Sequence, residues 1–199
     1  MRYAILGSGA IGHAIATQFA RKGIEVALAN KRGPESLGEI VAELGPNVRA
    51  VTAAEALGAD VVFLAVPFTA VPELVQGAGD WAGRIAIDAT NAIDFPAFTP
   101  TDLGGRMSTD VLAEKLVGAR VVKAFNSLPA PVLEADPAAA DGGRRVLFVS
   151  SNAASASTEV ATLIEALGFF PIQLGAIAAG GALQQFGGPL TVHSLIKQA

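Results

Sequence analysis

Few side chains in this sequence are suited to acid–base or nucleophilic chemistry. The chain has two histidines, His13 and His193, and no cysteine, which excludes disulfides, thiol nucleophiles and thiolate metal ligands. Neither histidine has a carboxylate at a spacing typical of an acid–base pair. Asp88 ends an apolar run, and we expect it to have a structural role in which it accepts hydrogen bonds from nearby loop amides. Lys123 lies inside another apolar run and either reaches solvent, pairs with an acid such as Asp88, or takes part in catalysis. We predict no metal site and no catalytic side chain.

The first dozen residues carry a pattern that is typical of phosphate binding. An apolar run at Tyr3-Ala4-Ile5-Leu6 predicts a strand, and the apolar spacing after the turn predicts a helix from about Ala10 to Lys22. In such a turn the first glycine permits the bend, the second lets a pyrophosphate approach the backbone, and the third lets the helix pack closely on the strand. The amides that begin the helix attract phosphates. We predict that a dinucleotide binds here, at Gly7, Ser8, Gly9, Ala10, Ile11 and Gly12.

The end of the second predicted strand indicates which dinucleotide binds. Enzymes that use NAD place Asp or Glu there, because a carboxylate accepts hydrogen bonds from the ribose hydroxyls and repels a 2′-phosphate. This chain has Asn30, Lys31 and Arg32 instead. Asn30 can donate to phosphate oxygens, and the planar guanidinium of Arg32 can bind a phosphate and stack on adenine. The pattern predicts NADP; the alternative is a solvated basic pair on a loop.

Other predicted strand ends complete the cofactor site. The carboxyl ends of strands near the topological switch line the ligand crevice of a doubly wound sheet. We expect cofactor contacts from Ala65, Val66 and Pro67, although Pro67 alternatively does no more than end its strand. Further cofactor contacts are assigned to Asn91 and to the strand end formed by Ala124, Phe125 and Asn126.

A second flat ligand needs two walls beside the cofactor. Hydride transfer between two stacked rings depends on close stacking at about 3–3.5 Å more than on a side-chain acid. Ala124 to Asn126 are expected to form the floor, and residues 187–190 the other wall, of an apolar slot lined by Phe125 and Leu190. The substrate contacts are assigned to Asn126, Leu128, Gly187, Gly188, Pro189 and Leu190, where glycines allow close backbone approach.

Strand and helix signals alternate along the chain. Strands are predicted at 3–6, 25–29, 48–51, 60–66, 84–87, 119–125, 145–150 and 169–174, and helices at 10–22, 34–44, 53–57, 71–76, 108–116 and 155–167. Ser108 is a candidate cap, residues 92–106 a long loop, residues 131–140 weakly helical or irregular, and the tail a short helix to Lys197. The alternation predicts an α/β, doubly wound Rossmann fold with a mostly parallel sheet. We divide it into a dinucleotide-binding domain, 1–175, and a short C-terminal extension, 176–199, which forms the acceptor-site wall and a candidate dimer contact.

Composition limits the classes of partner. The 199 residues carry a net charge of −4 and are 51% hydrophobic, which predicts one domain, with or without a small appendage, and a large core. No basic stretch is present, so nucleic acid and anionic membrane are not expected partners. The N-terminal apolar run breaks at Gly7, and no apolar stretch is long enough to span a bilayer. We expect a cytoplasmic protein.

Several of these motifs, taken together, resemble a known family. The residues 7–12, 30–33, 88–91, 121–126 and 188–190 occur in the same order in the NADP oxidoreductases that depend on the deazaflavin coenzyme F420. The chain is also similar to the reductase domain of the STEAP ferric reductases, which hand hydride from NADPH to a flavin. The resemblance implies a Rossmann domain with a small C-terminal extension, NADP at the glycine motif, a homodimer, and deazaflavin binding near residues 188–190. It weakens after Leu190, where a serine- and arginine-containing stretch of the family is replaced by Thr191 to Leu195.

The resemblance and the residues together imply an NADP-dependent oxidoreductase that transfers hydride between NADP(H) and a flavin or deazaflavin (F420-like) acceptor. An NADP(H)-binding redox sensor without turnover is the alternative, and it would have a closed or shallow second pocket. A reductase of imines or keto acids is disfavoured because such enzymes carry a large helical C-terminal domain, and fewer than thirty residues follow Leu174 here.

Overall fold

A computed structural model gives the fold and describes residues 1–139 and 141–199. Its strands are β1 (Tyr3–Leu6), β2 (Val26–Ala29), β3 (Val48–Ala50), β4 (Val61–Leu64), β5 (Ile85–Asp88), β6 (Ile93–Asp94), β7 (Thr99–Pro100), β8 (Arg120–Ala124), β9 (Arg144–Ser151), β10 (Phe170–Gly175) and β11 (Ile196–Lys197). Its α-helices are α1 (Ala10–Arg21), α2 (Gly38–Leu44), α3 (Ala53–Leu57), α4 (Val71–Val75), α5 (Ser108–Ala113), α6 (Ala130–Glu134), α7 (Ala154–Ala166) and α8 (Ala182–Gln184). Short 3-10 helices span Pro34–Leu37 and Phe68–Ala70, and a π-helical turn spans Ile177–Gly181.

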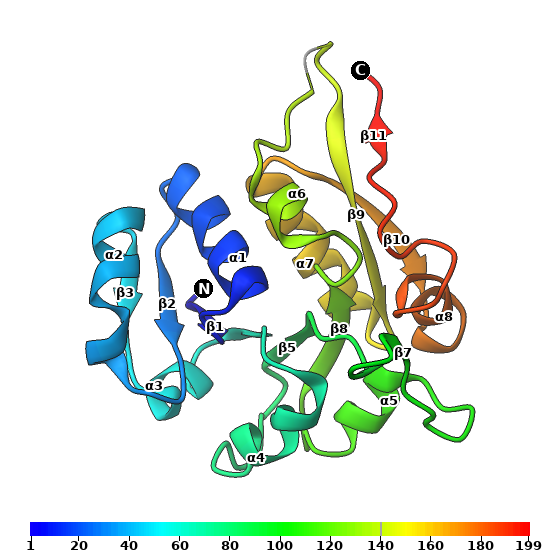
Figure 1. Cartoon of the computed structure of the whole chain (residues 1–199), viewed down its shortest axis with the longest axis horizontal. Coiled ribbons are helices and arrows are strands. Elements are labelled where there is room, and N and C mark those ends of the chain that lie inside the picture. The colour runs from blue at the N-terminus through cyan, green and yellow to red at the C-terminus, as the bar shows by residue number, and fades with distance from the viewer. Residues whose placement is uncertain (140) are drawn as a thin grey trace.

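The main sheet has the strand order β10-β9-β8-β5-β4-β1-β2-β3 (Figure 1). Within this sheet the neighbouring strands β8, β5, β4, β1, β2 and β3 all run parallel, whereas β9 is antiparallel to β8. The chain moves outward from β1 to β3, and then returns to the other side of β1 to lay down β4 and β5. This reversal confirms the doubly wound α/β fold and places the ligand crevice at the carboxyl ends of β1 and β4.

Helices cover both faces of the sheet because its strands are apolar on both faces. On one face Ile5, Phe63 and Ile87 pack with α1, α6 and α7. On the other face Leu6, Leu64 and Ala86 pack with α3, α4 and α5. Alternate residues of one strand therefore enter different cores, and the central strands β4 and β5 are buried at every position.

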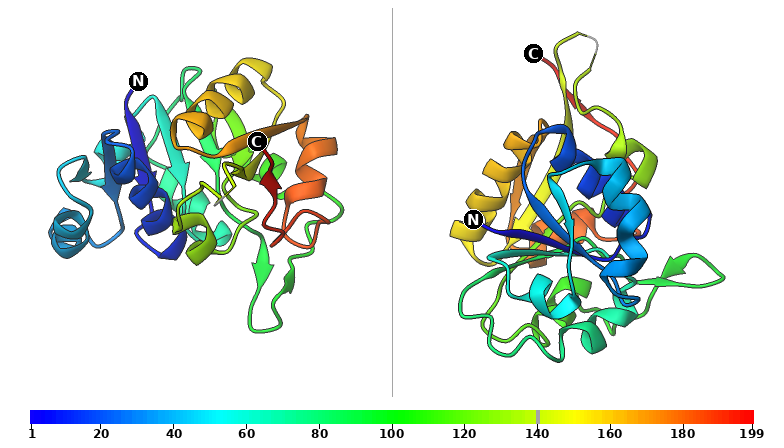
Figure 2. Two further views of the ribbon diagram at one scale, coloured as in Figure 1. Left: turned by 90° about the horizontal axis from the view of Figure 1, so that it is seen from above. Right: turned by 90° about the vertical axis from the view of Figure 1, so that its left-hand side faces the viewer.

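Two segments differ from the sequence-based prediction. Residues 92–106 were expected to form a loop, but they hold the β6–β7 hairpin, which projects from the body of the molecule (Figure 2). The tail was expected to end in a helix, but Ile196 and Lys197 pair with β9 as the antiparallel strand β11. All three of these strands, β6, β7 and β11, are two residues long, which is too short for a periodic pattern to reveal.

Smaller corrections concern two helices. The cap of α5 is Met107, and Ser108 is the first helical residue. The weakly helical stretch predicted at 131–140 contains α6 and then irregular chain, and residue 140 lies outside the described residues. Among the described residues no helix is both long and apolar enough to cross a membrane. The division of the chain at residue 175 stays a prediction.

Candidate functional site

The glycine turn joins β1 to α1 at the crevice. A Cβ atom on Gly7 would lie 2.1 Å from the carbonyl oxygen of Ala65, and one on Gly12 would lie 1.9 Å from the carbonyl oxygen of Gly7. Gly7 also has a φ of +116°, which other residues rarely adopt. Gly9 differs from both, because a Cβ there would meet no atom within 4 Å. The protein's own packing therefore requires Gly7 and Gly12, while the space over Gly9 is open to a ligand.

The first turn of α1 presents free amides next to that space. The first helical hydrogen bond is donated by the His13 amide to the Gly9 carbonyl, at 2.8 Å. The amides of residues 10 to 12 have no helical acceptor, and no side chain caps the helix. The helix dipole adds positive potential at this end. The arrangement suits a pyrophosphate. Binding of the dinucleotide by Ser8, Ala10 and Ile11 stays a prediction.

The side chain of Asn30 braces the corner where β2 ends. Its Nδ2 donates to the hydroxyl oxygens of Ser8, at 3.1 Å, and Ser36, at 3.0 Å. Its Oδ1 accepts from the Arg32 amide at 2.8 Å and from the Ser36 hydroxyl at 3.1 Å. The prediction that Asn30 donates directly to a phosphate is not supported by this geometry, because both of its N–H groups have partners. Asn30 instead fixes the loop that carries the two cations.

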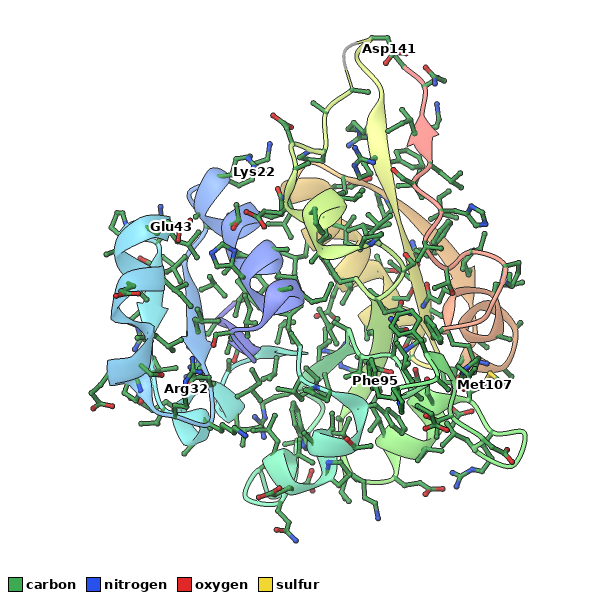
Figure 3. All side chains as sticks on the ribbon, viewed as in Figure 1. Lys22, Arg32, Glu43, Phe95, Met107 and Asp141 are labelled. Atoms are coloured by element: carbon green, nitrogen blue, oxygen red, sulfur yellow. The ribbon has the colours of Figure 1, made fainter. Side chains whose placement is uncertain are left out.

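Lys31 and Arg32 project from that loop into solvent. Both are exposed, and neither forms an ion pair with any described residue. Figure 3 shows Arg32 in the loop that follows β2. Ser36, which sequence reasoning missed, adds a hydroxyl to the same corner; its signal was a serine in the first turn after Gly33-Pro34. The corner offers unpaired positive charge where a 2′-phosphate would lie.

The end of β4 lies against the glycine turn. The Ala65 amide donates to the carbonyl of Leu6 at 2.8 Å, and the carbonyl of Ala65 faces Gly7. Val66 is half-buried and Pro67 is exposed. The structure therefore places Ala65, Val66 and Pro67 beside the glycine turn, and their contacts with a cofactor stay a prediction. Pro67 is also the N-cap residue of the 3-10 helix that follows.

A buried ion pair lies between the ends of β5 and β8. The register pairs Asp88 with Lys123, and the Lys123 ammonium lies 3.1 Å from Oδ2 of Asp88. Lys123 also donates to the carbonyl of Thr90 at 3.1 Å. Thr109 of α5 donates to Oδ2 at 2.6 Å, and Thr90 donates to Oδ1 through its amide and its hydroxyl. Of the alternatives for Lys123, the structure favours pairing with Asp88.

The environment of Asp88 holds its carboxylate in the charged form. Burial alone would raise the pKa of Asp88, but the Lys123 ammonium and the hydrogen bonds from Thr109, Thr90 and Lys123 outweigh burial and lower this pKa below its ordinary value. Both side chains are at most 1% exposed. The pair therefore fixes the two strand ends and has no access to a substrate.

Amide side chains link these strand ends to the C-terminal extension. Asn91 donates to the carbonyl of Asn126 at 2.9 Å, and Asn126 donates to the Asn91 side chain at 3.0 Å and to the carbonyl of Gln184 at 2.7 Å. Gln184 donates to the carbonyl of Lys123 at 2.7 Å and is fully buried. Sequence reasoning missed Gln184, because nothing local relates it to residues about sixty positions earlier. Asn126 thus uses both of its N–H groups within the protein.

The apolar slot is not built as predicted. Phe125 is 1% exposed, and its ring packs edge-on against Phe63, with 5.2 Å between centroids. Leu128 is also buried in this core. The prediction that the Phe125 side chain lines an open slot is therefore wrong, and Ala124 is buried as well. Phe125, which follows the last residue of β8, has a φ of +64°, in the left-handed region.

The glycines of the extension serve packing within the protein, Gly188 inside the extension and Gly187 against the β6–β7 hairpin. A Cβ on Gly188 would lie 2.6 Å from the carbonyl oxygens of Ala182 and Leu183, and one on Gly187 would lie 2.7 Å from Pro100. The Leu190 amide donates to the carbonyl of Leu183 at 2.9 Å. These contacts correct the interpretation that both glycines are present to admit a ligand; Pro189 next to them is exposed.

The side chains of the two histidines take no part in the contacts described above. His13 lies between Glu43 and Glu134, 3.8 Å from each carboxylate, so its side chain links α1 to α2 and α6. His193 is exposed. Within the described residues no group of three or more His, Asp or Glu side chains is arranged to hold a metal.

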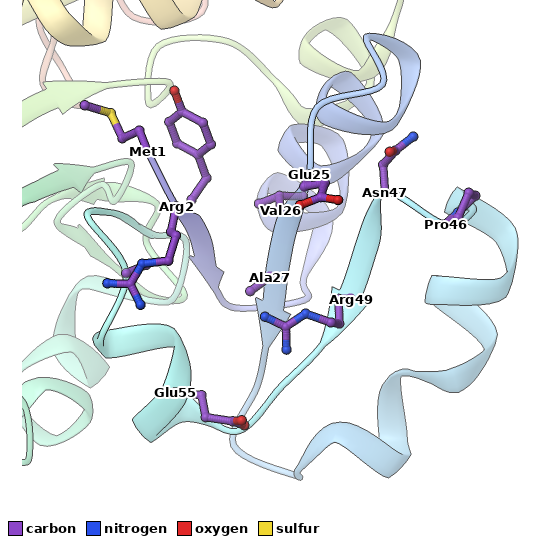
Figure 4. A pocket seen from close by; sticks show the side chains of 11 residues that line it. Met1, Arg2, Glu25, Val26, Ala27, Pro46, Asn47, Arg49 and Glu55 are labelled. Carbon is purple, nitrogen blue, oxygen red and sulfur yellow. The ribbon is translucent and has the colours of Figure 1, made fainter.

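A pocket of about 240 Å³ opens at the other edge of the sheet. It is lined by the first residues of β1, β2 and β3 and their neighbours, with Arg2, Glu25, Arg49 and Glu55 as its charged side chains (Figure 4). Since these strands are parallel, their first residues lie at the edge opposite to the glycine turn. Cofactors of doubly wound folds bind at the carboxyl ends, so we exclude this pocket as the dinucleotide site.

Comparison with known proteins agrees with this geometry. Residues 2–92 match the family model of "NADP oxidoreductase coenzyme F420-dependent". The fold matches a crystal structure of a hypothetical protein from Sinorhizobium meliloti with a TM-score of 0.96 and 52% identity, over 99% of this chain and 96% of that one. It also matches a putative F420-dependent NADP reductase from Arthrobacter with a TM-score of 0.74 and 31% identity, over 89% of this chain and 86% of that one.

A longer relative matches over part of its length. The chain is 31% identical over 181 residues to the metalloreductase STEAP3 of Rattus norvegicus, which covers 88% of this chain and 34% of that protein. The chain therefore spans about a third of this curated relative. The glycine turn, the open position at Gly9 and the basic corner after β2 all lie within the residues that match the family model. The chain belongs to the family of coenzyme F420-dependent NADP oxidoreductases.

Proposed function

We propose that this protein transfers hydride between NADP(H) and a flavin or deazaflavin ring. The observation that carries the proposal is the pairing of open space over Gly9 with the unpaired cations Lys31 and Arg32 at one crevice. The first would admit the pyrophosphate and the second the 2′-phosphate. NADPH would supply a hydride, and the acceptor ring would take up that hydride and one proton from solvent.

The chain's own residues have three tasks in this reaction. The amides of α1 and the basic corner bind the two phosphate groups. The Asp88–Lys123 pair and the Asn91–Asn126 contacts hold the ends of β5 and β8 rigid, so that the rings meet in a fixed orientation. The extension, held by Gln184, covers this side and excludes water. The titratable side chains at the ends of β5 and β8, Asp88 and Lys123, are buried, which favours an acceptor whose reduction needs no acid–base side chain.

A redox sensor that binds NADP(H) without turnover is the second candidate. It is favoured by the burial of Phe125 and Leu128, because these side chains leave less apolar surface for a second ring than the sequence suggested. The sensor would keep the cofactor corner unchanged.

One assay separates the two candidates. The protein is mixed with NADPH and, in turn, with FMN, FAD, F420 and simple quinones, and the absorbance of the reduced nicotinamide is followed. Oxidation with a flavin or deazaflavin supports the reductase. Tight NADPH binding without oxidation by any acceptor supports the sensor and contradicts the proposed reaction. The homodimer and the cytoplasmic location stay predictions; sedimentation of the pure protein would test the first.

A further inference from the structure

A small pocket lies between the β6–β7 hairpin region and the C-terminal extension. Its volume is about 50 Å³, which is enough for about four water molecules or a ligand group of similar size. One wall comes from residues 92–108 and the other from the extension, and the lining residues are Ala92, Pro100, Thr101, Leu103, Arg106, Ser108, Gln185 and Phe186. Ala92 directly follows Asn91, and Gln185 directly follows Gln184, so this pocket adjoins the amide cluster at the ends of β5 and β8.

The hydroxyl of Ser108 has no partner in this pocket wall. Ser108 is 3% exposed, and its Oγ is buried without any hydrogen bond. Native proteins seldom leave a buried hydroxyl unsatisfied, and such a group commonly marks a bound water, ion or ligand. The neighbouring hydroxyl of Thr109 differs, because it is used by Asp88.

One positively charged side chain lines the pocket. Among the described residues that line it, Arg106 alone is charged. Its side chain is 47% exposed and pairs with Glu114, which is outside the lining and uses one edge of the guanidinium. An arginine has five N–H donors in a rigid fork, so donors remain for a second anion. Thr101 donates to Asp94 at 2.7 Å and is therefore committed elsewhere.

We propose that this pocket binds the anionic end group, a phosphate or carboxylate, of the acceptor whose ring is reduced at the crevice. This inference rests on the proposed function. The ligand class follows from a volume that fits three to five heavy atoms at about one water-sized sphere each, from the guanidinium donors of Arg106 that its pair with Glu114 does not use, and from the Ser108 hydroxyl, which has no acceptor. Ser108 and Arg106 are the residues that distinguish acceptors with such a group from those without.

Riboflavin and FMN test this inference, because they share one ring system and differ by a phosphate. Flavin fluorescence is titrated with the full-length protein in the presence of NADP⁺, for the wild type, Ser108→Ala and Arg106→Gln. We expect the wild type to bind FMN about tenfold more tightly than riboflavin, which is the size of one hydrogen bond to a charged group. Each variant should lose most of this preference through weaker FMN binding, with riboflavin binding unchanged.

Two controls keep the result interpretable. Ser108→Ala should fold as the wild type does, because its hydroxyl has no partner to lose. Arg49→Gln removes the same charge from the pocket at the opposite sheet edge and should leave the FMN preference intact. Equal affinity for the two flavins in the wild type, a preference that survives both variants, or no flavin binding at all would overturn the inference. A phosphate-dependent preference without NADPH oxidation would support this pocket while overturning the proposed reaction.

Discussion

The two sides of the crevice use their polar side chains differently. At the end of β2, Asn30 and Ser36 bond to each other and leave Lys31 and Arg32 free. At the ends of β5 and β8, the side chains of Asp88, Lys123 and Gln184 are buried and bonded within the protein. The first side is therefore prepared to bind a ligand, and the second is a scaffold whose shape is fixed before any ligand arrives.

Removing one member of the buried ion pair should have the largest effect. Lys123→Met would leave Asp88 charged and unpaired in the core, which should lower the free energy of unfolding by about 3–5 kcal/mol. The double variant Lys123→Met/Asp88→Asn should recover much of this loss, because no uncompensated charge remains. Urea denaturation at neutral pH measures both. A single variant as stable as the wild type would show that the pair is not buried as described.

Acid should weaken the same pair. The pKa of Asp88 is lowered in the folded protein, chiefly because Lys123 and the hydrogen-bond donors outweigh burial. A carboxyl with a depressed folded pKa contributes stability that is complete above its unfolded value, about 3.9, and is lost as the pH falls through the folded value. Stability should thus keep its Asp88 contribution down to mildly acidic pH. In the wild type the free energy of unfolding should fall as the pH drops below about 3.9, and the Asp88→Asn variant should lack the part of this fall that comes from Asp88.

The glycine turn allows a comparison within one motif. Gly12→Ala would place a Cβ against the carbonyl of Gly7, and should lower the free energy of unfolding by about 3 kcal/mol, at the upper end of ordinary overpacking. Gly9→Ala meets no protein atom, so it should unfold as the wild type does and weaken NADPH binding instead. Thermal denaturation and a fluorescence titration of NADPH measure the two effects. Equal stability of the two variants would contradict this division of roles.

The two fully buried glutamines are a matched pair. Gln18 of α1 donates to the carbonyls of Leu133, at 2.6 Å, and Ala135, at 2.9 Å, whereas Gln184 donates to the carbonyl of Lys123. Replacing either with Leu should lower the free energy of unfolding by about 1–3 kcal/mol, because a buried carbonyl loses its donor. Gln184→Leu alone should raise the KM for the acceptor and speed hydrogen exchange in the extension. Identical effects of both variants on the acceptor would reduce Gln184 to a purely structural residue.

Local features of the site were predictable from the sequence. Gly7 and Gly12 are separated by five positions, and the strand and helix on either side fix what each must do. The cations at 31 and 32 follow a strand whose end was evident from its apolar run. Asn30 was expected to donate to a phosphate, but its N–H groups donate to Ser8 and Ser36, and the sequence could not reveal these bonds because they depend on how the loop folds back.

The other side of the crevice depends on contacts that the sequence does not encode locally. Asp88 meets Lys123 because β5 and β8 are neighbours with one particular register, and strand order alone would not give that register. Phe125 packs into the core against Phe63, which lies 62 positions earlier, and has a φ of +64°. Gln184 reaches Lys123 across 61 positions. Periodicity and motif spacing carry no information about such pairs.

The basic corner after β2 is most directly tested by the affinity of Arg32→Glu for NADPH and NADH. The exposed, unpaired guanidinium should bind the 2′-phosphate, and a carboxylate there should repel it. We expect NADPH to bind the variant at least about tenfold more weakly, while NADH binding stays the same or improves, with Arg49→Glu as a control far from the crevice. Unchanged NADPH affinity, or an equal loss for both nucleotides, would contradict the assignment of this corner to NADP.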